Sequence, residues 1–97
     1  MSPVAATILQ QLGGNRFIVM TGAKNFVYSK DTLWFNVPKT KNKANKVAVK
    51  LDPNDTYTMT FYKIRGVEVK TVSEHDGLYW DQLQSVFTKE TGLYTKL

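Results

Sequence analysis

Hydrophobic and polar residues alternate with a period of two on both sides of a lysine-rich break in the middle of the chain. The apolar positions are Leu33, Phe35 and Val37 before the break, and Val47, Val49 and Leu51 after it. Alternation that flanks a Pro/Asn/Lys-rich segment is typical of a β-hairpin with a long loop. We therefore predict a hairpin over residues 32–51, with one apolar face toward a core.

Further strands are predicted on both sides of this hairpin. Residues 56–62 alternate cleanly, after a turn predicted at Asp52–Asp55 because Pro and Asx residues favour turns. Lys63–Gly66 is expected to interrupt the pattern before a strand at residues 67–72. On the N-terminal side, the apolar run at residues 17–21 and the segment 25–28 are also predicted as strands.

Both ends of the chain show helical spacing. Ser2 and Pro3 are typical of a helix start, and Gly13-Gly14 of a helix end. Near the C-terminus, a polar connection at residues 73–77 precedes a helix predicted from Leu78 to Thr91. Asp76 is expected to cap that helix and Gly92 to terminate it. We expect Tyr79 to face the sheet and Trp80 to cover the helix–strand junction.

The order helix, five or six strands, helix predicts an α+β fold in a single domain spanning residues 1–97. Short turns between consecutive strands exclude parallel pairing, which needs long crossovers. The expected architecture is an antiparallel sheet with an N-terminal and a C-terminal helix packed on one face.

Composition narrows the functional classes. The 97 residues contain no cysteine, which excludes disulfides and thiolate metal sites. No apolar run is long enough for a membrane span, and the first residues do not resemble a signal peptide, so no membrane association is expected.

The net charge of +5 divides into +7 over residues 1–50 (eight Lys/Arg, one acid) and −2 over residues 51–97 (five Lys/Arg, seven acids). This asymmetry is compatible both with steering of a polyanion and with simple solubility.

Two segments, LGGNRFIVMTGAKNFVYS (residues 12–29) and VFTKETGLYTKL (residues 86–97), resemble a family of small uncharacterised proteins encoded by bacteriophages and integrated mobile elements. The resemblance implies an origin in a phage or mobile genome and a cytoplasmic setting in a bacterial host cell. It implies no catalytic residues.

No enzyme chemistry is predicted. Residues 21–25 (TGAKN) lack the second glycine and the following Ser/Thr of a phosphate-binding loop, so a β-turn explains them better. Glu74, His75 and Asp76 are consecutive, and neighbouring side chains of an extended chain point apart rather than toward one metal. We therefore expect no catalytic residues, no metal, no cofactor and no small-molecule substrate.

The strongest functional signal is the basic hairpin. Its candidate nucleic-acid-binding residues are Trp34, Lys39, Lys41, Lys43, Lys46 and Lys50. Lysines neutralise phosphates, and an exposed aromatic ring stacks on unpaired bases, so single-stranded nucleic acid is favoured over duplex. Tyr28 and Tyr62 are candidates to extend this platform, and an exposed Trp80 would be a second contact.

Two alternatives stay open. The same aromatic face suits a protein-interaction module that modulates a host or phage complex, or a homo-oligomer. The lysines also protect edge strands from aggregation.

Overall fold

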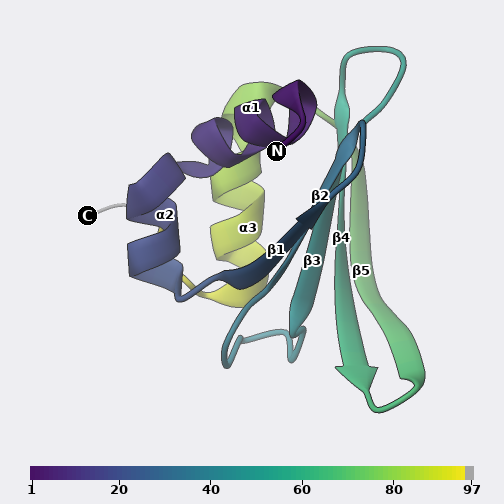
Figure 1. Cartoon of the computed structure of the whole chain (residues 1–97). Coiled ribbons are helices and arrows are strands. Elements are labelled where there is room, and N and C mark those ends of the chain that lie inside the picture. The colour runs from purple at the N-terminus through teal and green to yellow at the C-terminus, as the bar shows by residue number, and fades with distance from the viewer. Residues whose placement is uncertain (96–97) are drawn as a thin grey trace.

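A computed structural model describes residues 1–95 as one antiparallel five-stranded sheet with its helices on one face (Figure 1). The strands follow the chain in the order β1-β2-β3-β4-β5. The strands are β1 (Lys24–Tyr28), β2 (Thr32–Asn36), β3 (Lys46–Leu51), β4 (Tyr57–Arg65) and β5 (Glu68–Leu78). The helices are α1 (Pro3–Leu12), α2 (Gly14–Thr21), the short 3₁₀ helix η1 (Trp80–Gln82) and α3 (Leu83–Thr91). The predicted α+β class and the placement of the helices on one face are confirmed.

The predicted hairpin forms with the expected register. Phe35 pairs with Val47 and Leu33 with Val49, and all four side chains are buried beneath the helices. Residues that alternate with them therefore point to the opposite side of the sheet, which no helix covers (Figure 1). We call this side the open face.

Aromatic rings form the centre of the core between the sheet and the helices. Phe17 of α2 and Phe87 of α3 are fully buried, and their ring centroids lie 5.1 Å apart. Phe35 of β2 meets the Phe17 ring edge-on at 5.3 Å, an arrangement that aromatic pairs favour. The three rings join two helices and the sheet into one packed unit.

The N-terminal region contains two helices rather than a helix and a strand. Ser2 caps α1 as predicted, because its side chain accepts a hydrogen bond from the Ala5 N–H. The strand predicted at residues 17–21 is wrong, since these residues lie in α2. Phe17 and Thr21, four residues apart, are buried while Val19 is exposed, which is helical spacing.

The helices α2 and α3 end with the same local structure. The Thr21 hydroxyl donates to the carbonyl of Phe17, and the Thr91 hydroxyl donates to the carbonyl of Phe87, both at 2.7 Å. Each hydroxyl also accepts a backbone N–H two residues further on. Gly22 and Gly92 then adopt left-handed conformations, with φ of 74° and 76°. The predicted role of Gly92 is confirmed.

Strands β4 and β5 are longer than the sequence pattern predicted. β4 continues through Lys63 to Arg65, so the predicted interruption there is wrong, and the turn lies at residues 66–67. The polar segment 73–77 is part of β5, because one side of an edge strand faces water and tolerates polar residues. Asp76 therefore does not cap a helix. Instead, Tyr79 is the N-cap of η1, and its backbone N–H donates to Gln82 Oε1 at 2.8 Å.

Candidate nucleic-acid interface

The open face carries a hollow lined by aromatic and aliphatic side chains around one lysine. Its volume is about 510 Å³, and it crosses all five strands. We call it the aromatic hollow, and its lining residues are Val27, Trp34, Lys46, Tyr62, Ile64 and Val69. None of these residues is acidic, so the Lys46 ammonium group is the only formal charge in the lining.

The other half of the open face has a different chemistry. Lys50 lines it together with Asp31, Asp52 and Glu74. A hydrogen bond from the Thr32 hydroxyl is the main cause that lowers the pKa of Asp31, and the charge of Lys50 lowers it further. Lys50 thus lies on the predicted face but among carboxylates, in an acidic half that adjoins the aromatic hollow and shares Trp34 and Tyr62 with it.

The lysine-rich loop, residues 37–45, has a defined backbone. The side chain of Asn45 donates to the Ile64 carbonyl at 2.8 Å and accepts the Ile64 N–H at 2.9 Å, which continues the ladder to β4. The Lys41 N–H donates to the carbonyl of Thr91 at the end of α3, at 2.8 Å. Ala44 is buried, whereas the side chains of Lys39, Lys41 and Lys43 are exposed. The fold therefore holds these three lysines in fixed positions toward solvent.

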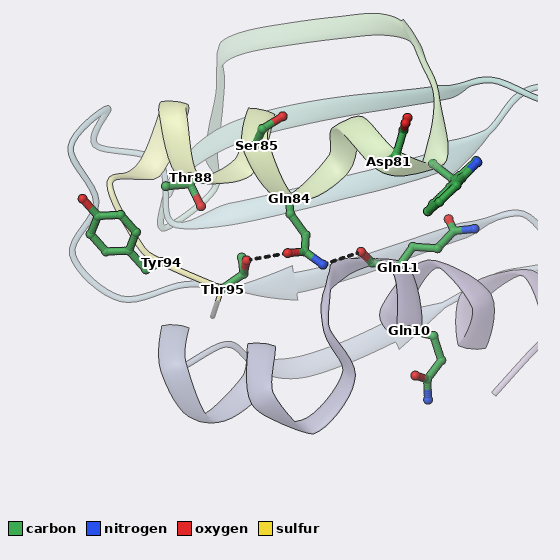
Figure 2. Close-up of a pocket in the computed structure, with 9 residues that line it drawn as sticks. Gln10, Gln11, Asp81, Gln84, Ser85, Thr88, Tyr94 and Thr95 are labelled. Carbon is green, nitrogen blue, oxygen red and sulfur yellow. Dashed lines mark hydrogen bonds between the residues drawn. The ribbon is translucent and has the colours of Figure 1, made fainter. Parts of the chain in front are cut away.

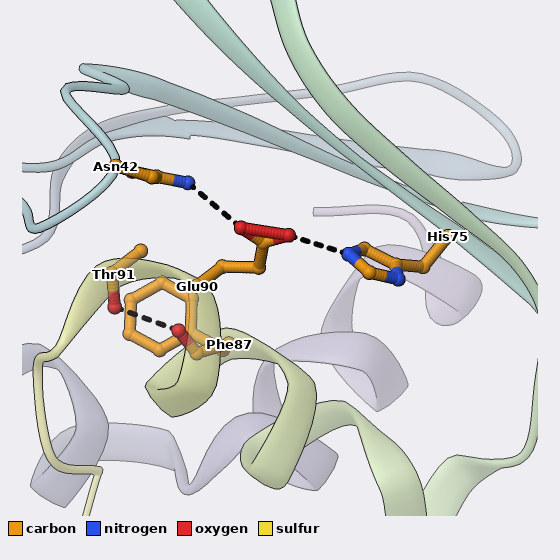
Figure 3. A network of polar contacts seen from close by, with 5 residues as sticks. All are labelled: Asn42, His75, Phe87, Glu90 and Thr91. Carbon is orange, nitrogen blue, oxygen red and sulfur yellow. Dashed lines mark hydrogen bonds and ion pairs between the residues drawn. The ribbon is translucent and has the colours of Figure 1, made fainter.

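A small polar network attaches this loop to the helical layer. Figure 3 shows Asn42 and His75 pointing toward the carboxylate of Glu90 from opposite sides. His75 Nε2 lies 2.6 Å from Glu90 Oε2, and the Asn42 amide donates to Glu90 Oε1 at 3.4 Å. Burial opposes ionisation of Glu90, but hydrogen bonds from His75 and Asn42 outweigh it, so the pKa of Glu90 is lowered from its ordinary 4.5.

The lowered pKa predicts a pH-dependent contribution to stability. Ionised Glu90 stabilises the fold above about pH 4.5, its unfolded value, and this contribution is lost as the pH falls through the lower folded pKa. We expect Glu90→Gln to reduce the melting temperature at pH 7 by roughly 4–8 °C, corresponding to about 1 kcal/mol. Thermal unfolding followed by circular dichroism at pH 7 and pH 3 should show the difference from wild type narrowing in acid.

Asp55→Asn is the control, because Asp55 is exposed, has no ion pair among residues 1–95, and has a left-handed backbone conformation that Asn also tolerates. It removes the same charge without touching the network and should leave the melting temperature nearly unchanged at both pH values. An equal loss for Glu90→Gln at pH 7 and pH 3 would contradict the assigned role of its ionised form.

Basic residues gather at one end of the sheet. β2 and β4 end there, and β1, β3 and β5 begin there, so residues distant in sequence become neighbours (Figure 1). We call this the lysine end, and its cations are Lys24, Lys39, Lys41, Lys43, Lys46, Lys63, Arg65 and Lys70. Glu68 is the one acid in the strands and turns of this end, whereas Asp31, Asp52, Asp55 and Asp76 lie toward the opposite end.

The cations of the lysine end are not neutralised within the protein. Among residues 1–95, the one ion pair within 4.0 Å joins His75 and Glu90, so no lysine or arginine in that range has a carboxylate partner at that distance. Lys63 and Lys70 even stand directly opposite each other in the β4–β5 ladder. Like charges in such positions repel each other, which an external anion would relieve.

The structure divides the sequence-predicted residues into groups. Trp34 and Lys46 share the aromatic hollow with Tyr62, while Lys39, Lys41 and Lys43 lie on the adjoining loop at the lysine end. Tyr28 pairs with Leu33, whose side chain faces the helices, so Tyr28 does not extend the aromatic platform. Sequence reasoning missed Val27, Ile64 and Val69, which line the hollow. It also missed Lys63, Arg65 and Lys70, which belong to the lysine end but alternate with the lining residues of β4 and β5 and so point to the helical side of the sheet.

A second hollow, of about 750 Å³, lies on the helical side between α1, α3 and the chain after α3 (Figure 2). Its floor includes Gln84, whose amide donates to the Gln11 carbonyl and accepts from the Thr95 hydroxyl. Trp80 lines it and is 63% exposed, so it does not cover the helix–strand junction. Tyr79 is 62% exposed and does not face the sheet. Among residues 1–95, its lining contains one charged side chain, that of Asp81.

Comparison with known proteins gives no match: no family model, curated protein or solved structure is similar to the chain. The resemblance of residues 12–29 and 86–97 to phage proteins therefore stays a prediction.

Within residues 1–95, no helix has the length and apolar character required to cross a membrane. The same residues contain no cluster of three or more His, Cys, Asp or Glu side chains suited to a metal ion.

Proposed function

We propose that the protein binds nucleic acid, single-stranded in preference to duplex, through the aromatic hollow and the lysine end. The observation that supports this most directly is the position of Trp34 and Tyr62 on an uncovered sheet face, next to unpaired cations. In the phage or mobile-element setting that the terminal segments suggest, this would be an accessory protein of the bacterial cytoplasm. The proposal assigns no catalytic step.

Phosphate groups account for the affinity in this proposal. Lys39, Lys41 and Lys43 are exposed and held by a fixed backbone, so few loop conformations are lost on binding. Each phosphate that a lysine neutralises releases condensed counterions, which makes the affinity fall as salt rises. The carboxylates at the opposite end repel phosphates and direct the lysine end toward the ligand.

Base stacking accounts for the preference for single strands. Trp34 and Tyr62 lie on β2 and β4 with β3 between them, and both border the same hollow. Unpaired bases can place a ring face against these side chains, whereas the bases of a duplex are already stacked on each other. The hollow therefore favours single strands over duplexes, because only an unpaired base has a free ring face to place against it.

A second candidate, a protein-interaction role, is favoured by the aliphatic part of the same hollow. Val27 is 54% exposed and Val69 is 64% exposed, and exposed apolar clusters occur at protein interfaces. The lysines separate the two candidates, because an apolar protein interface survives when Lys39, Lys41 and Lys43 become Gln and a phosphate-binding one does not.

The deciding experiment is fluorescence anisotropy with labelled single-stranded and duplex DNA, from low to physiological salt. Trp34→Leu removes the ring and keeps an apolar side chain, so the fold is retained. Stacking is worth about 1–3 kcal/mol per base, so we expect single-strand binding to weaken roughly 5- to 150-fold. Trp80→Leu is the control, since Trp80 is the other tryptophan and is exposed, whereas Trp34 is half-buried, and Trp80 lies on the helical side.

Wild-type protein that binds neither DNA at low salt would refute the proposal. Equal losses of affinity for Trp34→Leu and Trp80→Leu would show that the open face is not the binding surface. Circular dichroism of each variant verifies that a loss of binding does not reflect unfolding.

A further inference from the structure

We infer that the aromatic hollow binds the single strand without selecting its bases or its sugar, so that DNA and RNA of any sequence are ligands. This inference rests on the proposed function and specifies its substrate class. It follows from which hydrogen-bonding groups the hollow contains and which it lacks.

The hollow presents ring faces and aliphatic surface rather than a pattern of donors and acceptors. Of its six lining residues, Val27, Ile64 and Val69 carry no polar side-chain atom. The remaining polar atoms are the Lys46 ammonium group, the Trp34 indole N–H and the Tyr62 hydroxyl. Base identity in nucleic acids is read by bidentate groups such as the Asn and Gln amides or the Arg guanidinium. None of these side chains lines the hollow.

Three hydroxyl groups in the acidic half of the open face are already occupied. Thr58 donates to Asp52 at 2.6 Å, Thr60 donates to Glu74 at 3.2 Å and Thr32 donates to Asp31 at 2.9 Å. Each of these protons is thus committed to a carboxylate. The same carboxylates repel phosphates, so the strand does not extend into that half of the open face.

This boundary implies a short footprint. From β1 to β5 the hollow spans four interstrand spacings, or about 19 Å at roughly 4.8 Å each. The acidic half limits the bound strand on one side, and the lysine loop that contacts its phosphates lies on the other side. We therefore expect a site size near the lower end of single-strand-binding domains, about four nucleotides.

Asn36 provides an internal check. It stands in the row of Lys46 and Tyr62 on the open face, outside the lining of the hollow. The nearby Asn45 amide already bonds the backbone of Ile64. If a base were read at this end of the sheet, the Asn36 side chain would be the group to do so.

The test is competition anisotropy with unlabelled 12-nucleotide oligo(dT), oligo(dC), oligo(dA) and oligo(rU) at one salt concentration, together with oligo(dT) of 2–12 nucleotides. We expect the four 12-mers to compete within about fivefold of one another, and the affinity gain per added nucleotide to fall sharply beyond about four. Asn36→Ala should leave this pattern unchanged.

A preference above tenfold for one base or one sugar, with all oligonucleotides still binding in a salt-sensitive manner, would overturn the inference and leave the proposed function in place. Loss of such a preference in Asn36→Ala would identify the reading residue and likewise overturn it. Absence of binding to every oligonucleotide at low salt would instead refute the proposed function itself.

Discussion

Phe35→Ala is expected to lower the melting temperature by at least about 15 °C, because this side chain connects the sheet to both helical segments of the core. Phe35 is fully buried, and its ring lies within 5.3 Å of Phe17, 5.5 Å of Phe26 and 6.1 Å of Phe87. Truncation of a buried phenylalanine costs about 3–5 kcal/mol through lost apolar contact and the cavity left behind. The total stability of a domain is about 5–15 kcal/mol, so a large part of the margin would be removed.

Urea unfolding followed by circular dichroism measures this loss directly. Val19→Ala is the control: it also shortens an apolar side chain, but Val19 is 81% exposed and should change stability by less than about 0.5 kcal/mol. A loss below about 1 kcal/mol for Phe35→Ala would show that the three-ring centre is not the main source of stability.

The triple variant K39Q/K41Q/K43Q is expected to weaken single-stranded DNA binding on the order of 100-fold at low salt. The three side chains are exposed and unpaired among residues 1–95, so they are available to phosphates. Each contact with a single-stranded phosphate contributes about −0.7 to the slope of log affinity against log salt, so three lost contacts should flatten the slope by about 2. A salt titration by anisotropy gives both quantities.

The chain provides a control for net charge. K30Q/K50Q removes lysines from the opposite end, where Lys50 stands beside Asp31, Asp52 and Glu74. We expect less than about a threefold loss of affinity, because these cations lie among carboxylates and away from the phosphate path. Equal losses per charge in the two variants would mean that net charge alone attracts the ligand. The melting temperature should not change in either variant, since the Lys41–Thr91 bond involves only backbone atoms.

The hairpin could be predicted because period-two alternation determines which side of a sheet each residue faces. Trp34, Lys46 and Lys50 therefore fall on one face in both the pattern and the structure. Asp52 directly follows β3 and Asp31 directly precedes β2, so these two carboxylates are close to Lys50 along the hairpin itself, whereas Glu74 comes from β5, which only the completed sheet places on this face. Lys63, Arg65 and Lys70 reach the lysine end for the same reason.

Helix α2 could not be distinguished from a strand by its apolar run alone. Five consecutive residues of FIVMT are too few for a helical period to stand out from a buried strand. The useful signal was weaker: Phe17 and Thr21 are four residues apart, and Gly22 follows directly, as at the end of a helix. The polar segment at residues 73–77 was predicted as a connection but belongs to β5. An edge strand has fewer apolar positions than a central one, so its pattern resembles that of a loop.

The shared ending of α2 and α3 has a consequence for how this chain can diverge. Residues 17–22 and 87–92 both follow the pattern Phe-x-x-x-Thr-Gly. In the structure, each copy places a phenylalanine in the core and ends its helix one turn later. These two strings thus encode the architecture of the fold. Proteins that keep these strings while replacing Trp34 or the loop lysines would share the scaffold and differ in what they bind.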